Sequence, residues 1–342
     1  MQGGPRLVNQ RGRSLHFWKM DLLLVLEAYD ARLNLAVCTA SLLAREASVR
    51  HHLASGSAAA LAQALAGALL LAGTERAGDL QAPRVDVQLE CGGPLRGLLV
   101  DADGSGAVRG LVRVNDLDRT GARVESEPAF ADLDPPARLL RFDARPVLST
   151  GHDEKAGLLS VLRAQPGSDT LHRAAFPFAG ANLGAALTLF LRSDRPPGGE
   201  LALEVLHRGG EPLASVAGAL VWPASVDEEE RARALGKPLR QAGLHQAMLK
   251  AAGANAHALA QELGRELSLG PLRLLSEVRP RFACRCNRER VVRALGTLGA
   301  AELKDMAGRD GGASATCDFC MVTYRISAGE LLELAGDGPQ KS

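Results

Sequence analysis

Four cysteines near the C-terminus constrain this chain more than any other feature of its sequence. They form a C-x-C pair, Cys284 and Cys286, and a C-x-x-C pair, Cys317 and Cys320, with the spacer 287–316 between the pairs. Four thiolates at this spacing can converge on one tetrahedral metal ion, and zinc favours that soft, four-coordinate arrangement. Because a closed set of four cysteines leaves no position for water, we predict one structural or redox-active zinc ion per chain rather than a hydrolytic one.

Charge and composition argue against several classes of protein. The net charge of +1 gives no support for a nucleic-acid partner, which requires a clustered basic surface. Six cysteines in 342 residues do not make a small secreted disulfide scaffold, and Cys38 and Cys91 are expected to be small buried residues. The apolar run 22–26 is too short for an export signal, and the alanine-rich stretch 58–73 is too short for a membrane span and predicts a buried helix. We therefore expect a cytoplasmic protein with no membrane partner.

The order of the predicted elements favours an α+β fold. Alternating apolar residues predict strands over 33–37 and 85–89, and strand-like runs predict others over 95–100, 108–114, 146–149, 157–163, 200–206 and 214–221. Helices are predicted over 41–53, 58–72 with Ser57 as N-cap, and 181–192. Residues 101–106 are interpreted as a hairpin turn rather than a calcium loop, and residues 115–140 as a surface excursion. Sheet and helix do not alternate in the regular βαβ order of a doubly wound fold.

Changes in composition divide the chain into segments. We predict a flexible tail over residues 1–19, a mixed sheet-and-helix N-terminal domain over 20–223, a helical linker over 224–280, a small four-cysteine zinc-binding module over 281–328, and a C-terminal tail over 329–342. Met20 begins the ordered pattern and is a candidate for the initiating residue.

The predicted linker has the pattern of helices that are only marginally stable. Ser225 precedes a run of acidic residues, as an N-cap does, and residues 226–270 carry a helical pattern without a strand signal. Leu259, Leu263 and Leu267 form a narrow apolar stripe, and glycines together with Pro238 interrupt the segment repeatedly. Such helices are stabilised mainly by packing on their neighbours, so we expect the order of this segment to be conditional.

The chemistry of the cysteine pairs makes a redox switch possible. Peroxide and hypochlorite oxidise thiolates to sulfenic acids, which condense to a disulfide when a second thiol is adjacent. Oxidation would pair Cys284 with Cys286 and Cys317 with Cys320, which removes all four metal ligands and should unfold residues 281–327. Four arginines nearby either offset the negative charge of the bound thiolates or form a solvated helix face: Arg285, Arg288, Arg290 and Arg293.

The cysteine motif and its surroundings resemble the heat-shock protein 33 family of redox-regulated bacterial chaperones. The resemblance is carried by Phe-Ala-Cys-Arg-Cys-Asn-Arg-Glu-Arg at 282–290, Cys-Asp-Phe-Cys at 317–320 followed by Tyr324, and, in the front domain, Gly-Gly-Pro at 92–94. It covers about residues 20–330. Asn287 stands where the family usually has serine, Ile326 replaces a usual aromatic residue, and the segment 1–19 has no counterpart.

The resemblance implies an ATP-independent holdase that is inactive when reduced and zinc-bound. Oxidative stress would unfold the zinc module and the linker, expose apolar surface on the N-terminal domain, and allow binding of unfolded client proteins by a homodimer. Unfolded clients present the same kind of apolar surface that such a holdase would expose.

Two other functions remain open on the sequence alone. A zinc-ribbon adaptor that contacts nucleic acid or protein would bind zinc constitutively and carry a basic face with stacking aromatic residues. A thiol oxidoreductase would use Cys317 and Cys320, but its C-x-x-C normally opens a helix, whereas here the motif follows a glycine loop and precedes a strand. With no catalytic triad, carboxylate pair or phosphate loop identifiable, we predict that the protein is not an enzyme.

Overall fold

The computed structural model describes residues 20–73, 83–117, 139–149, 157–164, 171–178, 182–193, 198–208, 211–251 and 254–336. The chain forms two compact units, unit 1 (Met1–Phe282) and unit 2 (Ala283–Ser342). The predicted tail 1–19 and most of the predicted surface excursion 115–140 lie outside the described residues. The predicted α+β class is confirmed, because helices and sheets are mixed in unit 1 and again in unit 2.

Two six-stranded sheets form the frame of unit 1. The first has the strand order β11-β1-β2-β10-β9-β6, with bounds Leu272–Val278, Leu23–Ala28, Leu33–Thr39, Glu211–Pro223, Glu200–Arg208 and Leu140–Arg141. The second has the order β12-β5-β4-β3-β7-β8, with bounds Arg281–Phe282, Ala107–Val112, Gly97–Asp103, Arg84–Glu90, Gly157–Ala164 and Leu171–Phe178. Neighbouring strands are antiparallel, except that β12 runs parallel to β5. The turn between β4 and β5 confirms the predicted hairpin.

One alanine-rich helix lies between the two sheets. Helix α2 (Ser55–Gly73) contacts strands of both, and 17 of its 19 residues are buried. Helices α1 (Ser41–His51), α3 (Arg145–Leu148) and α4 (Leu183–Ser193) complete this layer. By length and composition α2 could cross a membrane, so the prediction that this stretch is too short for a membrane span was wrong. The prediction of a buried helix is confirmed, because 94% of the apolar window of α2 is buried inside the protein. The close approach of α2 to the first sheet requires glycine at position 218 of β10, because a Cβ there would lie 2.7 Å from the side chain of Leu70 of α2.

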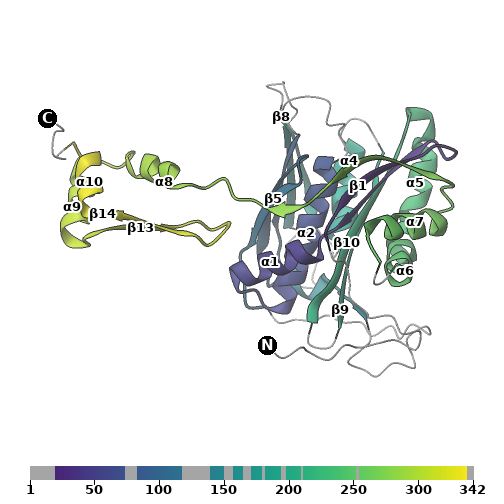
Figure 1. Cartoon of the computed structure of the whole chain (residues 1–342), viewed down its shortest axis with the longest axis horizontal. Helices are drawn as coiled ribbons and strands as arrows, with labels where there is room; N and C mark the ends of the chain where they lie inside the picture. The colour runs from purple at the N-terminus through teal and green to yellow at the C-terminus, as the bar shows by residue number, and fades with distance from the viewer. Residues whose placement is uncertain are drawn as a thin grey trace. The chain divides into compact units, whose positions relative to one another are not determined.

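The helices that follow β10 cover the opposite face of the first sheet (Figure 1). They are a short 3-10 turn η3 (Val226–Glu228), α5 (Glu229–Pro238), a π-helical turn η4 (Leu239–Gly243), α6 (Leu244–Lys250) and α7 (Ala256–Glu266). Their apolar side chains pack with those of β1, β2, β9 and β10 in a second core cluster. The predicted helices over 226–270 are confirmed. The prediction that the linker is helical to residue 280 was wrong, because Leu272–Val278 forms β11, the edge strand beside β1.

Unit 2 is a small arrangement of three helices and one hairpin. Its elements are α8 (Arg288–Leu295), α9 (Ala300–Arg309), β13 (Gly312–Thr316), β14 (Thr323–Ser327) and α10 (Ala328–Leu334). Helices α8 and α9 lie between the two cysteine pairs, and β14 follows the second pair. The predicted tail from residue 329 was wrong, because Ser327 and Glu330 form a reciprocal capping box that starts α10.

Four further details of the sequence-based prediction need correction. The one-turn helix α3 stands where a strand was predicted over 146–149, since Pro146 is favourable in the first turn of a helix. Ser57 is not an N-cap, because α2 begins at Ser55 and the Ser57 hydroxyl donates to the carbonyl of Val114. The side chain of Ser225 makes no capping hydrogen bond. Strands β1 and β8 were not predicted at all.

Candidate metal centre

The four predicted cysteines come together in unit 2. Their Sγ atoms all lie within 4.8 Å of one another. The shortest contacts join the two halves of the motif: Cys284 Sγ lies 3.6 Å from Cys317 Sγ, and Cys286 Sγ lies 3.2 Å from Cys320 Sγ. A tetrahedral zinc ion with Zn–S bonds of about 2.3 Å sets its sulfurs about 3.8 Å apart. The four cysteines could therefore hold a metal ion, and a small soft cation fits their spacing.

The β13–β14 hairpin presents the second pair of sulfurs. Its register pairs Gly312 with Ser327 and Thr316 with Thr323, which places Cys317 and Cys320 in the connecting turn. The turn is closed by hydrogen bonds from the amide of Met321 to the carbonyl of Cys317 (2.8 Å) and from the amide of Cys317 to the carbonyl of Val322 (3.0 Å). Strand β13 was not predicted from the sequence, although it fixes the geometry of this half of the site.

A capped helix follows the first pair directly. Asn287 is the N-cap of α8, and its Oδ1 accepts a hydrogen bond of 2.8 Å from the amide of Arg290. This asparagine stands at the position where the resemblance led us to expect serine, and both residues are good N-caps. The substitution therefore preserves the physical role of the position, which is to begin a helix immediately after the second sulfur.

Replacing Asn287 by alanine should loosen α8 without unfolding unit 1. Loss of an N-cap costs about 1 kcal/mol, and α8 has no fully buried side chain to compensate. We expect amide exchange in α8 of the reduced, metal-loaded protein to speed up about fivefold. The matched control is Asn255→Ala, which removes the equivalent cap of α7, where Asn255 Oδ1 accepts from the amide of Ala258. Unchanged exchange in α8 of the Asn287 variant would contradict the assignment of the cap.

Tyr324 is a neighbour of the cluster that sequence reasoning did not assign to the site. Its hydroxyl lies 3.2 Å from Cys286 Sγ. This hydrogen bond, followed by desolvation, raises the pKa of Tyr324 to about 12, so the hydroxyl stays protonated and can donate to a thiolate. Two features of the sequence could have assigned Tyr324 to the site. The chain has only two tyrosines, and Tyr324 lies just after Cys320 in a segment with the alternating pattern of a strand.

The environment of the sulfurs favours thiols over thiolates until a cation binds. Burial raises the pKa of Cys320 to about 12, and the hydrogen bond to Cys286 adds to this effect. Burial also raises the pKa of Cys317. A coordinated cation reverses this preference because it removes the thiol protons outright. Metal binding at this site is therefore coupled to proton release, and loss of the metal lets the sulfurs take their protons back.

Two of the nearby arginines, Arg288 and Arg290, take structural roles. Arg288 donates to Glu330 Oε2 (2.9 Å) and to the carbonyl of Arg325 (3.1 Å), so it fastens the start of α8 to β14 and α10. Arg290 donates to the carbonyl of Arg285 at 2.9 Å. These two guanidinium groups therefore bind oxygen atoms, and their effect on the cluster is that of nearby positive charge.

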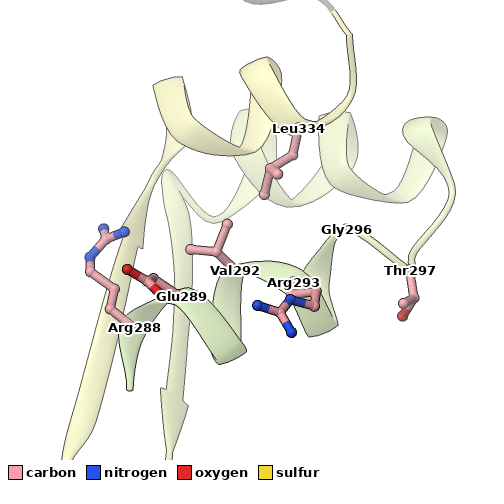
Figure 2. A pocket seen from close by; sticks show the side chains of 7 residues that line it. All are labelled: Arg288, Glu289, Val292, Arg293, Gly296, Thr297 and Leu334. Atoms are coloured by element: carbon pink, nitrogen blue, oxygen red, sulfur yellow. The ribbon is translucent and has the colours of Figure 1, made fainter. Parts of the chain in front are cut away.

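The apolar core of unit 2 is thin. Its buried apolar side chains are Leu303, Ala307, Ile326 and Leu331. A groove of about 610 Å³ separates α8 from α10. Figure 2 shows Val292 of α8 and Leu334 of α10 pointing toward one another across it, with Arg288 and Arg293 on the α8 side. A unit of this size with so few fully buried apolar side chains depends on additional links, and the cysteine cluster ties the start of α8 to the hairpin.

The other two cysteines belong to unit 1. Cys38 on β2 is fully buried, and Cys91 after β3 is half-buried. Burial raises the pKa of both thiols, which keeps them protonated and unreactive. The prediction of a small buried residue is confirmed for Cys38 and only partly for Cys91.

Comparisons with known proteins match this chain over most of its length. The profile of the family described as Hsp33 protein matches residues 21–327. A protein named 33 kDa chaperonin from Rippkaea orientalis is 31% identical over 324 residues, which cover 93% of this chain and 97% of that one. Another of the same name from Thermus thermophilus is 32% identical, covering 85% and 80%. The crystal structure of a 33 kDa chaperonin from Thermotoga maritima has the same fold, with a TM-score of 0.69 at 19% identity, and covers 92% of this chain and 98% of its own.

Proposed function

The chain belongs to the Hsp33 family of chaperones, and from this premise we propose that it is a redox-regulated holdase that works without ATP. The observation that carries the proposal is the set of four sulfurs within 4.8 Å, built into a unit with a thin apolar core. Such a unit can be folded when the metal is bound and unfolded when its ligands are oxidised. That coupling supports a switch that responds to the oxidation state of the cell.

In the resting state we propose that Cys284, Cys286, Cys317 and Cys320 hold one zinc ion as thiolates. Zinc supplies a redox-inert cation that four thiolates satisfy completely. Asn287 and Arg288 order α8 beside the first pair, and Tyr324 donates a hydrogen bond to Cys286. The protein contributes the arrangement of the sulfurs and their supporting hydrogen bonds.

Oxidation would join the cysteines within each half of the motif. Each pair gives two electrons to one peroxide molecule, forms one S–S bond, and the peroxide oxygens leave as water after protonation. In the folded cluster the short contacts cross between the halves, at 3.6 and 3.2 Å. Once the metal leaves and unit 2 unfolds, loop closure favours the neighbouring cysteine of the same pair over a distant cysteine of the other pair. This supports the pairs Cys284–Cys286 and Cys317–Cys320.

Release of the linker would then expose the surface that binds clients. Helices α5 to α7 cover an apolar face of the first sheet that includes Leu24, Leu35, Leu206 and Val221. Uncovering that face presents contiguous apolar area, which unfolded proteins match with apolar side chains of their own. We propose that residues 20–223 bind clients and form the homodimer interface of the oxidised protein, and that residues 224–271, the part of the predicted linker 224–280 that precedes β11, act as the redox-labile cover.

The remaining assignments follow from the same proposal. We place the protein in the cytoplasm, where thiols are kept reduced until stress occurs. Its role is binding rather than catalysis, and the net charge of +1 favours protein clients over nucleic acids.

Peroxide at elevated temperature should release about one zinc ion per chain and switch on chaperone activity together. The measurement is zinc release, with a colorimetric chelator, and light scattering of aggregating citrate synthase, before and after oxidation and in the absence of ATP. Dithiothreitol with added zinc should reverse both changes. If oxidised protein loses its zinc but leaves aggregation unchanged, the holdase function is wrong.

A further inference from the structure

A buried carboxylate at the start of β9 lies where the linker meets the first sheet. The side chain of Glu200 is 1% exposed and contacts two guanidinium groups. Arg192 of α4 donates to its Oε1 from Nη2 (2.5 Å) and Nε (3.2 Å). Arg240 of η4, in the linker, donates to its Oε2 at 2.6 Å. The two oxygens thus have different partners, one from the body of unit 1 and one from its cover.

The linker backbone is shaped to reach this carboxylate. A Cβ on Gly236 would lie 2.0 Å from Glu200 Oε2, so glycine at this position lets the helix pass close to the carboxylate without displacing it. Arg240 is flanked by Leu239 and Leu244, which are 0% and 1% exposed and pack in the core cluster beneath the linker. The cover therefore offers the sheet a specific pattern, an arginine set among leucines.

The neighbouring carboxylate on the same strand is satisfied differently. Arg141 of β6 holds Glu204 with two hydrogen bonds, from Nε to Oε1 (2.9 Å) and from Nη2 to Oε2 (2.7 Å). Both hydrogen bonds come from β6, outside the linker, although His245 of α6 also lies 3.8 Å from Glu204 Oε1 and Arg141 also donates to the carbonyl of Gln241. Glu200, in contrast, keeps Arg192 on Oε1 and loses the partner of Oε2. Among the described residues of this sheet face, Glu200 is the carboxylate that linker release leaves half-satisfied.

We infer that Glu200 makes an arginine-selective subsite on the apolar sheet face, occupied by Arg240 in the resting chain and by an arginine of the client after the linker is released. The inference rests on the proposed holdase function and names the client chemistry: an unfolded segment with an arginine next to leucines. A guanidinium fits because its flat fork can hydrogen-bond to Oε2 while its apolar stem lies along the sheet. Lysine presents a more strongly hydrated point charge and should fill the subsite less well.

The test uses the linker itself as a defined probe. Fluorescently labelled peptides of residues 235–250, with the native sequence, with Arg240→Gln and with Arg240→Lys, are titrated by anisotropy against the oxidised full-length protein. We expect the native peptide to bind about fivefold more tightly than the Arg240→Gln peptide, with Arg240→Lys between them, since a charged hydrogen bond at a solvent-open site is worth only part of its buried value. Oxidised Glu200→Gln protein should bind all three peptides alike.

The control protein is Glu90→Gln, which makes the same substitution at an exposed carboxylate of the second sheet and should keep the discrimination. Equal binding of the three peptides by the native protein, or discrimination that persists in Glu200→Gln, overturns the subsite. The peptide series on native protein decides the question even if Glu200→Gln fails to fold. Aggregation assays on the same samples separate the two ideas: suppression without arginine discrimination leaves the holdase standing and removes the subsite, whereas absent suppression removes the holdase.

Discussion

A serine in place of Cys320 should give a reduced protein that lacks a full equivalent of zinc and whose unit 2 is unfolded. Cys320 is the most buried of the four cysteines, at 7% exposure, and its sulfur lies 3.2 Å from that of Cys286. A hydroxyl is a poor ligand for a site built of thiolates, and the thin core formed by Leu303, Ala307, Ile326 and Leu331 cannot hold the unit alone. Structural zinc contributes about 10 kcal/mol or more to modules of this kind, far above the stability of the apolar core.

Zinc content by mass spectrometry and amide exchange over residues 283–336 check this prediction. The control is Cys91→Ser, which changes a half-buried cysteine of unit 1 and should keep both zinc and exchange protection. A Cys320→Ser protein with one tightly bound zinc ion and a protected α9 would show that the cluster does not hold unit 2 together.

Truncating Leu263 to alanine should release the linker while zinc stays bound. Leu263 of α7 is 0% exposed and packs in the second core cluster against the first sheet. Removal of a buried leucine side chain costs about 2–5 kcal/mol, a large share of what docks these short helices. We therefore expect the reduced protein to suppress aggregation at temperatures where the native reduced protein does not, and to be cleaved by protease between residues 226 and 270.

The matched control for this variant is Val226→Ala, at a linker position that is 70% exposed, and it should behave as native. Zinc is measured on each sample, because the prediction is that the linker helices undock while the four cysteines still hold zinc. A Leu263→Ala protein that becomes protease-sensitive in the linker, retains zinc and still does not suppress aggregation would contradict the proposal that linker release uncovers the client site.

The four-cysteine cluster was predictable because it depends on local chemistry. Spacing of four cysteines within one short segment restricts the geometry strongly, and the structure brings the same four sulfurs together. Tyr324 was missed because its contact with Cys286 depends on the register of β13 and β14, which short-range patterns do not report. The function of the neighbouring arginines was open for the same reason, since the partner of Arg288 is Glu330, 42 residues away.

The fold was predictable where a helix or strand has one environment along its length. Helix α2 is apolar all round and is buried between two sheets, which agrees with its composition. Strand β1 was missed because it is covered on both faces: Leu23 belongs to the core that contains α2, while Leu24 and Leu26 belong to the core beneath the linker. A strand buried on both sides loses the alternation that identifies strands in a sequence. Strand β11 depends on pairing with β1, at the other end of unit 1 in the chain, and no local pattern encodes that distance.

Because β11 pairs with β1, the segment that covers the first sheet is attached to that sheet at its C-terminal end. Strand β10 ends at Pro223 and β11 begins at Leu272, and both belong to the first sheet, so the segment 224–271 is anchored at both ends. As long as β11 stays paired, undocked helices remain a tethered loop whose local concentration over the sheet is on the order of millimolar. Under the proposed function, a bound client would have to compete with this tethered segment. Restoring unit 2 by reduction and zinc would make re-docking intramolecular, so client release would need no energy source other than the refolding of the chain itself.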